Sequence, residues 1–493
     1  MRDVRSPWLP LFAGALFAFS AGEAGAQYSN SMRAPTMTVA PRITPMAPIA
    51  PTLRPQIHYN LQSDTGGPRK PPPRRPPSAQ GPSGPSGPTG PRNAQTTPRR
   101  AAPVTSAAQI RSVPNEVVIE VAGSPSDAQV VALAGRHRLT RMESQPFALT
   151  NSTYFRWQIR DGRSVSEVVT QLRADPNITS AQPNHIFTLN QNAVASLPRS
   201  IGADPSQYAA GKLRLKQAHS LSRGDNVLVA VIDSGIDVTH PELVGVIAGT
   251  FDPLKSDEGP HAHGTGVAGL IAGHGRLTGA APSSQILAVR AFAVTGKSAE
   301  GNTFAILKSL EWSVGRGARI INMRFAGPND PAIGRALASA FKKGVVLVAA
   351  AGNAGPKSPP LFPASDPNVI AVSATDIDDK IFAASNRGKH VAITAPGVDI
   401  LVSAPDAAYT VASGTSFSAP QVSGIAALLL SRKPDMSPDA VREVLMSTAR
   451  DLGPKGRDEQ FGAGLVDALA AISAVGPAAI DTADRQEPIQ VRR

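Results

Sequence analysis

The chain has 493 residues with 49 Lys and Arg against 37 Asp and Glu, a formal net charge of +12, and it contains 46 Pro, 43 Gly and no Cys. Such a length allows roughly two to four domains. The lack of cysteine excludes a disulfide scaffold, a thiolate metal site and a cysteine nucleophile. The basic excess suggests an anionic partner, such as nucleic acid or a charged surface, depending on where the charge lies.

The first 26 residues have the pattern of a secretory signal peptide. Arg2 and Arg5 precede an apolar stretch over residues 8–19, and the small-x-small pattern Ala24-Gly25-Ala26 follows. The apolar stretch is shorter than the ~20 residues of a membrane-spanning helix, which disfavours the alternative of a retained anchor. We therefore expect a secreted protein, or one of the periplasm or cell envelope.

Residues 27–112 are expected to form a disordered, basic, proline-rich linker. They hold 18 of the 46 prolines and eleven basic residues against one acid, Asp64, so that their net charge is +10. Such a segment has too few apolar side chains to offset the entropy of ordering. The collagen-like run at 81–91 is far too short for a triple helix. The basic excess therefore belongs to a spacer, because the other 407 residues share only +2.

Residues 113–190 regain the patterning of a small globular domain. The expected elements are strands at 116–121, 142–149, 154–160 and 178–189 and helices at 127–137 and 164–173. Their order, β-α-β-β-α-β, is typical of an α+β ferredoxin-like plait. Ser124 and Pro125 predict the start of the first helix. Alternation of Phe155, Trp157 and Ile159 predicts a half-buried strand.

After a linker at 191–204, residues 205–475 alternate apolar strands with helical segments, and 476–493 form a polar tail. The expected strands lie at 227–232, 285–289, 319–323, 345–350 and 369–372. Their near-continuous apolarity predicts a parallel sheet covered on both faces, an α/β doubly wound architecture. In such folds ligands bind beyond the carboxyl ends of the strands. Functional side chains are therefore expected there.

Three segments place catalytic residue types at such positions. Asp233 follows an apolar strand, His263 begins a helix of small residues, and Ser416 lies where another helix begins. A serine hydroxyl needs a base to take its proton, and a buried Asp can orient a neutral His for that task. Asn353 follows the strand at 345–350, and its amide could join the Ser416 N–H as an oxyanion hole.

These segments resemble the four signature segments of the subtilisin-like serine proteases, or subtilases. Their order is Asp, His, Asn, Ser with separations of 30, 90 and 63 residues, and Ala395-Pro396-Gly397 and residues 461–468 add further matches. The resemblance covers roughly 205–475. It implies a mostly parallel seven-stranded subtilisin-like sheet and an endopeptidase. It also implies that residues 113–190 resemble the inhibitory propeptide that precedes many subtilases, with the processing region near residues 190–208.

The candidate residues also have alternative interpretations that do not involve this catalytic set. Asp233 could cap a strand end, Asn353 could be a turn residue, and Ser418 is a rival nucleophile by proximity. His261 and His263 could form a metal pair, but no third ligand has a suggestive spacing. We expect no metal in the catalytic site and no cofactor. A structural calcium at Asp376-Ile377-Asp378-Asp379 is an alternative to a solvated turn.

One segment departs from the resemblance. Arg324, Phe325 and Ala326, followed by Gly327, stand where subtilases usually have Ser-Leu-Gly-Gly on the substrate-binding strand. These four residues are our candidate substrate-binding residues. Alternation predicts that one of Arg324 and Phe325 faces the cleft and the other the interior. A cleft-facing Arg324 would favour an acidic substrate side chain or narrow the cleft.

The leading hypothesis is a monomeric serine endopeptidase made as a zymogen, with protein or peptide substrates and its own prodomain as partners. The basic linker is expected to hold it near an anionic envelope surface rather than nucleic acid. The alternative is a catalytically impaired binding protein on a protease scaffold at the cell envelope. The altered segment at 322–327 and the long linker favour this alternative, whereas the complete catalytic set opposes it.

Overall fold

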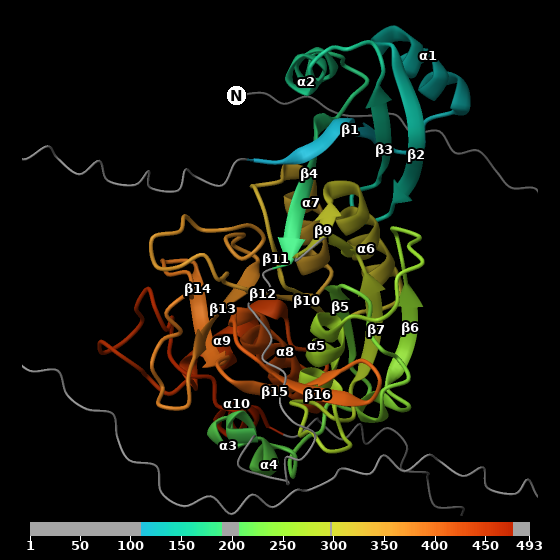
Figure 1. Ribbon diagram of the computed structural model, residues 1–493. Coiled ribbons are helices and arrows are strands. Elements are labelled where there is room, and N and C mark those ends of the chain that lie inside the picture. Colours follow the sequence, from blue (N-terminus) through green and yellow to red (C-terminus); the bar gives the residue numbers. More distant parts are fainter. Residues whose placement is uncertain (1–109, 190–206, 296–297, 477–493) are drawn as a thin grey trace, which may run out of the picture. The chain divides into compact units, whose positions relative to one another are not determined.

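The computed structural model describes residues 110–189, 207–295 and 298–476 (Figure 1). The predicted signal peptide, nearly all of the basic linker, the linker at 191–204 and residues 477–493 of the tail lie outside the described residues. No helix in the described ranges is long and apolar enough to cross a membrane.

The N-terminal elements form the predicted ferredoxin-like plait. They are β1 (Ser112–Ala122), α1 (Asp127–His137), β2 (Leu139–Phe147), β3 (Ser152–Ile159), α2 (Val165–Arg173) and β4 (Ser180–Leu189). The strands pair antiparallel in the order β2-β3-β1-β4. Val117, Trp157 and Leu172 lie in the core between this sheet and the two helices. The plait therefore has a hydrophobic core of its own.

The start of α1 differs from the sequence prediction. Its N-cap is Ser126 rather than Ser124, so Pro125 precedes the helix. The Gln129 N–H donates to Ser126 Oγ at 3.3 Å, and the Ser126 N–H donates to Gln129 Oε1 at 2.8 Å. Such a capping box satisfies two helix-end donors reciprocally, which a cap at Ser124 would not achieve here.

Strand β3 has the predicted half-buried pattern over most of its length. Phe155, Trp157 and Ile159 face the plait helices as expected, whereas the opposite face is partly exposed toward the end of the strand. Tyr154 is an exception, because it lies on that opposite face and is fully buried in a cluster with residues of the following domain. Local alternation could not reveal this tertiary packing.

The parallel sheet is the predicted seven-stranded sheet, with the order β14-β13-β12-β10-β5-β7-β6 (Figure 1). Its strands are β5 (Leu228–Asp233), β6 (Ile247–Phe251), β7 (Gln285–Arg290), β10 (Ile320–Met323), β12 (Val346–Ala350), β13 (Val369–Thr375) and β14 (Val391–Pro396). Every ladder between neighbouring strands is parallel. The apolar strands that the sequence predicted are confirmed within one to three residues at their ends.

Helices cover both faces of this sheet. Helices α5 (Ala262–Ala272) and α8 (Thr415–Arg432) pack on the face that carries Val229 and Val231. Helices α6 (Thr303–Gly315) and α7 (Pro331–Lys342) pack on the face that carries Ala230 and Ile232. The remaining elements are α3 (Tyr208–Lys212), α4 (Leu215–Ala218), η2 (Pro241–Leu243), β15 (Ile400–Ala404), β16 (Ala408–Ala412), α9 (Pro438–Ser447) and α10 (Ala468–Ala474).

Strand β4 extends the plait sheet onto the following domain. It pairs antiparallel with β9 (Ser298–Asn302), which forms a hairpin with β8 (Ala293–Thr295), and with the short strand β11 (Phe325–Ala326). Leu189 lies opposite Phe325 in this register. Phe187 packs edge-on against Phe325 with 5.6 Å between the ring centres. The end of the plait therefore lies along the segment that the sequence suggested as a substrate-binding strand.

Candidate active site

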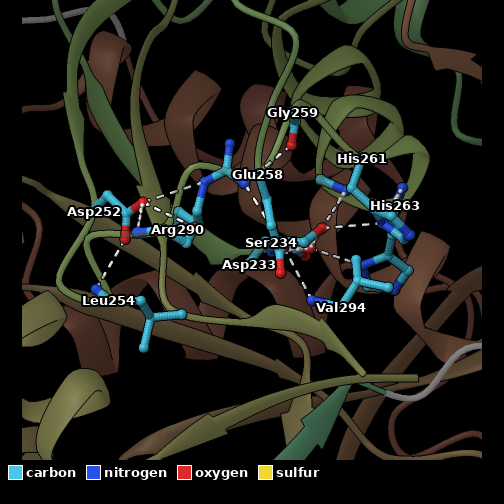
Figure 2. A network of polar contacts seen from close by, with 12 residues as sticks. Asp233, Ser234, Asp252, Leu254, Glu258, Gly259, His261, His263, Arg290 and Val294 are labelled. Atoms are coloured by element: carbon cyan, nitrogen blue, oxygen red, sulfur yellow. Dashed lines mark hydrogen bonds and ion pairs between the residues drawn. The ribbon is translucent and has the colours of Figure 1, made fainter. Parts of the chain in front are cut away.

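Asp233 and His263 are brought together by the ends of two elements. Asp233 ends β5, and His263 is in the first turn of α5. His263 Nδ1 and Asp233 Oδ1 are 2.7 Å apart, and both side chains are buried (Figure 2). The N–H and the hydroxyl of Ser234 also donate to Asp233 Oδ1, at 2.7 and 3.0 Å. The carboxylate is thereby fixed to accept the Nδ1 proton of His263.

His261 belongs to the frame of the site. As the N-cap of α5, its Nδ1 accepts from the His263 N–H at 3.2 Å, and its own N–H donates to Gly235 O at 2.8 Å. Nδ1 of His261 also lies 3.2 Å from Ser234 Oγ (Figure 2). No group of three or more potential metal ligands occurs among the described residues. These contacts give His261 a capping role.

Arg290 at the end of β7 fixes the loop that leads into α5. It donates to Gly259 O at 3.0 Å and forms ion pairs with Asp252 at 3.6 Å and Glu258 at 4.0 Å (Figure 2). A Cβ atom at Gly235 would lie 2.3 Å from this guanidinium, so a side chain there would require the Arg290 guanidinium to shift. Arg290 thus holds the loop that precedes α5 in place.

Ser416 lies in the first turn of α8, and Asn353, in the segment after β12, contacts the first residue of this helix. The Phe417 ring is 6.0 Å from the His263 ring, which places the first turn of α8 beside the imidazole. The Thr415 N–H and hydroxyl donate to Asn353 Oδ1 at 3.0 and 2.8 Å. Asn353 Nδ2 is buried and has no hydrogen-bond partner within the described residues. The amide is therefore oriented by its oxygen and keeps its donor end available.

The alternative nucleophile and the alternative calcium site named from the sequence both have hydrogen bonds or ion pairs elsewhere. Ser418 Oγ donates to the carbonyls of Ala395 and Pro396 at 3.0 and 3.2 Å, so its hydroxyl is occupied away from His263. In the Asp376–Asp379 turn, Asp376 Oδ1 accepts from two backbone N–H groups, and Asp379 pairs with Lys212 and Arg450. The suggested calcium there stays a prediction, and this turn is held without it.

The substrate-binding candidates are buried in the structure. Arg324 and Phe325 are 0% and 1% exposed, so neither lies in an open cleft. Phe325 packs between Phe187 and Phe292, with 5.6 and 5.1 Å between ring centres. Ala326 pairs with β4, and a Cβ atom at Gly327 would lie 2.3 Å from Phe187. Phe325 thus lies in the interior, as predicted for one of the first two residues, and the role of these candidates in substrate binding stays a prediction.

Arg324 points at the Asp233–His263 pair. Its Nη2 lies 2.5 Å from His263 Nε2 and 3.2 Å from Nδ1, and its Nε lies 3.7 Å from Asp233 Oδ2. The guanidinium carbon is 5.1 Å from the centre of the Phe417 ring, within the range of a cation–π contact. The arginine is therefore in contact with both members of the pair.

Burial and charge set the protonation of these groups. Burial lowers the pKa of His263, the Arg324 charge lowers it further, and Asp233 opposes both. Burial alone would raise the pKa of Asp233, but the charges of His263 and Arg324 and its hydrogen bonds keep it well below the usual value. Burial lowers the pKa of Arg324 to about 10, against the opposing Asp233 charge. At neutral pH the arginine and the aspartate are charged and the imidazole is neutral.

Sequence reasoning missed several supporting residues. Ser234 and Thr415 directly adjoin predicted catalytic residues, so their polar side chains were a usable signal. Phe417 also adjoins Ser416, but nothing local indicated its ring contact with His263. Arg290 gave no local signal because its partners come from a separate loop.

Comparison with known proteins agrees with this geometry. The model of the subtilase family matches residues 224–464. The chain is 35% identical over 313 residues to the minor extracellular protease Epr of Bacillus subtilis (strain 168), covering 61% of this chain and 47% of Epr. It is 34% identical over 315 residues to subtilisin E of the same strain, covering 62% of this chain and 78% of the relative. It thus spans about half the length of Epr and most of subtilisin E.

A solved structure shows the same fold. Fervidolysin from Fervidobacterium pennivorans, described as a keratinolytic enzyme related to subtilisin, has a TM-score of 0.64 and 24% identity, covering 75% of this chain and 62% of fervidolysin. The chain belongs to the subtilase family of serine endopeptidases.

Proposed function

We propose that the protein is a secreted serine endopeptidase, made as a zymogen, that uses Asp233, His263 and Ser416 with Asn353 in the oxyanion hole. The observation that carries the proposal is the 2.7 Å contact between His263 Nδ1 and Asp233 Oδ1 beside the first turn of α8. This contact fixes the imidazole tautomer that leaves Nε2 as the acceptor.

The reaction follows from the positions of these groups. Ser416 Oγ attacks the scissile carbonyl while His263 Nε2 takes its proton and later gives it to the leaving amine. Asp233 stabilises the imidazolium that forms. Asn353 Nδ2 and the Ser416 N–H donate to the oxyanion, and the N-terminus of α8 favours negative charge there. Water then hydrolyses the acyl-enzyme by the same proton transfers.

The plait is proposed to be the inhibitory prodomain. Its strand β4 occupies the edges of β9 and β11, which an extended substrate would otherwise use. Polar contacts reinforce this arrangement: Glu120 pairs with Arg335, and Glu143 lies 2.5 Å from Lys308 Nζ. The buried Asp330 accepts from Thr303 at 2.6 Å and contacts His185 of β4 at 3.1 Å.

A fluorophosphonate probe tests this function. We expect the purified full chain to be labelled on Ser416 and to digest casein, because the probe reacts with an activated serine. Labelling and digestion should both be lost in Ser416→Ala, whereas Ser418→Ala, the matched neighbouring serine, should retain labelling. A folded chain that never labels, even after long exposure, would rule out the proposal.

The second candidate is a binding protein on a protease scaffold. The contact of the Arg324 guanidinium with the His263 ring favours it, since a cation there opposes the imidazolium that the protease reaction requires. The casein digest distinguishes the two candidates, because only the protease would digest casein. A complete set of catalytic residue types favours the protease.

A further inference from the structure

The segment after β12, which carries the proposed oxyanion donor Asn353, is held by a second asparagine, Asn386. The Ala354 N–H donates to Asn386 Oδ1 at 2.8 Å. The Asn386 N–H in turn donates to Gly352 O at 2.9 Å. The two partners of Asn386 are therefore the residues on either side of Asn353.

The proposed donor is held from two directions. The Thr415 N–H and hydroxyl, from the start of α8, donate to Asn353 Oδ1 at 3.0 and 2.8 Å. On the backbone side, the Gly355 N–H donates to Ala384 O at 2.8 Å and continues the contact that Asn386 makes. Helix α8 thus fixes the Asn353 side chain, and residues 384–386 fix its backbone. The position of Asn353 Nδ2 depends on both.

The Asn386 side chain is fully buried, and only one end of its amide is paired. Oδ1 accepts from Ala354, whereas Nδ2 has no hydrogen-bond partner within the described residues. Residue 352 is a glycine with a φ of +113°, and a Cβ atom there would lie 2.5 Å from Asn386 Nδ2. Because a buried unpaired donor is costly, a residue that only filled this space would be more stable as an apolar side chain. The Asn386 oxygen therefore has a task that offsets this cost.

The task that fits these contacts is to fix the oxyanion donor before the reaction. An oxyanion hole lowers the barrier because its donors are already in place when the charge develops. We propose that Asn386 is a positioning residue that holds Asn353 Nδ2 in its productive place by binding the chain on both sides of Asn353. The inference rests on the proposed function and adds a residue that acts through Asn353 instead of touching the substrate.

A double-mutant cycle tests this role. Steady-state kcat and KM on a chromogenic peptide are measured for the full chain, Asn386→Leu, Asn353→Ala and the double variant, with active enzyme counted by fluorophosphonate titration. Asn386→Leu keeps the volume and removes the acceptor. We expect it to lower kcat about 10-fold at unchanged KM, a part of the ~10²–10³-fold that the donor itself supplies. In the Asn353→Ala background it should lower kcat by less than about twofold, because no donor is left to misplace.

The matched control is Asn322→Leu. Asn322 on β10 is also a fully buried asparagine with one unpaired amide atom, and its Nδ2 donates to Ser423 Oγ at 2.8 Å. Any effect of this change on kcat should be the same with and without Asn353, since Asn322 does not bind the chain beside it. Equal losses of kcat for Asn386→Leu in the two backgrounds, or a rise in KM at constant kcat, would overturn the proposal.

A smaller variant covers the case in which Asn386→Leu does not fold. A peptide aldehyde forms a tetrahedral adduct with an active serine, whereas the corresponding peptide alcohol forms none. Asn386→Ser should bind the aldehyde about 10-fold more weakly than the unmodified chain and the alcohol equally well, because only the adduct uses the oxyanion hole. Equal binding of the aldehyde would refute the positioning role. An unmodified chain that neither binds the aldehyde more tightly than the alcohol nor is labelled on Ser416 would instead refute the protease function itself.

Discussion

The two ends of the Asn353 side chain have different roles: the oxygen is fixed by Thr415, and the nitrogen is the proposed oxyanion donor. Its oxygen accepts two hydrogen bonds from Thr415, and its nitrogen is left without a partner in the described residues. Gly414 has a φ of +149°, and a Cβ atom there would lie 2.9 Å from Asn353 Nδ2. Glycine therefore keeps the space in front of the amide clear for an oxyanion.

Replacing this donor should affect turnover more than binding. We predict that Asn353→Ala lowers kcat by about 10²- to 10³-fold with little change in KM, because the oxyanion forms only in the transition state. Steady-state kinetics on a chromogenic peptide measures both constants. Asn368→Ala is the control, since Asn368 bonds Asp366 in a separate loop. A rise in KM at constant kcat would instead assign Asn353 to ground-state binding.

Among the elements, strand β4 is the one that relates the plait to the site. It runs antiparallel to β11, with Leu189 opposite Phe325 and Arg324 next along the partner strand. The described part of β4 thus ends beside Arg324, which contacts His263. We therefore expect the enzyme to cleave its own chain just after the plait.

We predict that maturation creates a new N-terminus within residues 190–206. N-terminal sequencing of the purified mature protein locates the cut, and Ser416→Ala should remain uncut because self-cleavage needs the nucleophile. Ser418→Ala should mature normally. A cut inside 113–189, or equal processing of Ser416→Ala, would contradict this assignment.

The elements and the catalytic residue types were predictable because their signals are local. Apolar strands such as Val346–Ala350 and the residues at their ends can be recognised from short segments. The position of Arg324 could not be predicted, because its partner His263 is 61 residues away and the strand breaks beside it. The burial of Tyr154 on the other face of β3 was missed for a related reason, since it packs in a cluster with residues that come later in the chain.

At the scale of the whole molecule, most of the net charge and the proposed catalytic residues lie in different segments of the sequence. The predicted linker at 27–112 carries +10 of the net +12. Exposed Lys and Arg attract anionic surfaces over about a Debye length, ~8 Å at physiological ionic strength. We propose that this segment holds the enzyme at the cell envelope.

Deleting 27–109, which stops short of β1, should abolish salt-sensitive association with cells or with anionic vesicles and leave the specific activity unchanged. Co-sedimentation at low and high salt measures the association. Deleting 477–493 is the matched control, because this segment has three acidic and three basic residues and no net charge. Unchanged association after deletion of 27–109 would refute the role.

If the plait is the prodomain proposed above, the pairing of β4 with β9 and β11 would make activity depend on concentration. While the chain is intact, a tethered strand faces these edges at an effective concentration of about millimolar. After the chain is cut, rebinding becomes a bimolecular event governed by the total amount of protein. The enzyme would then stay inhibited where its concentration is high and become active when it is diluted. Proteolysis would therefore begin only at some distance from the producing cell.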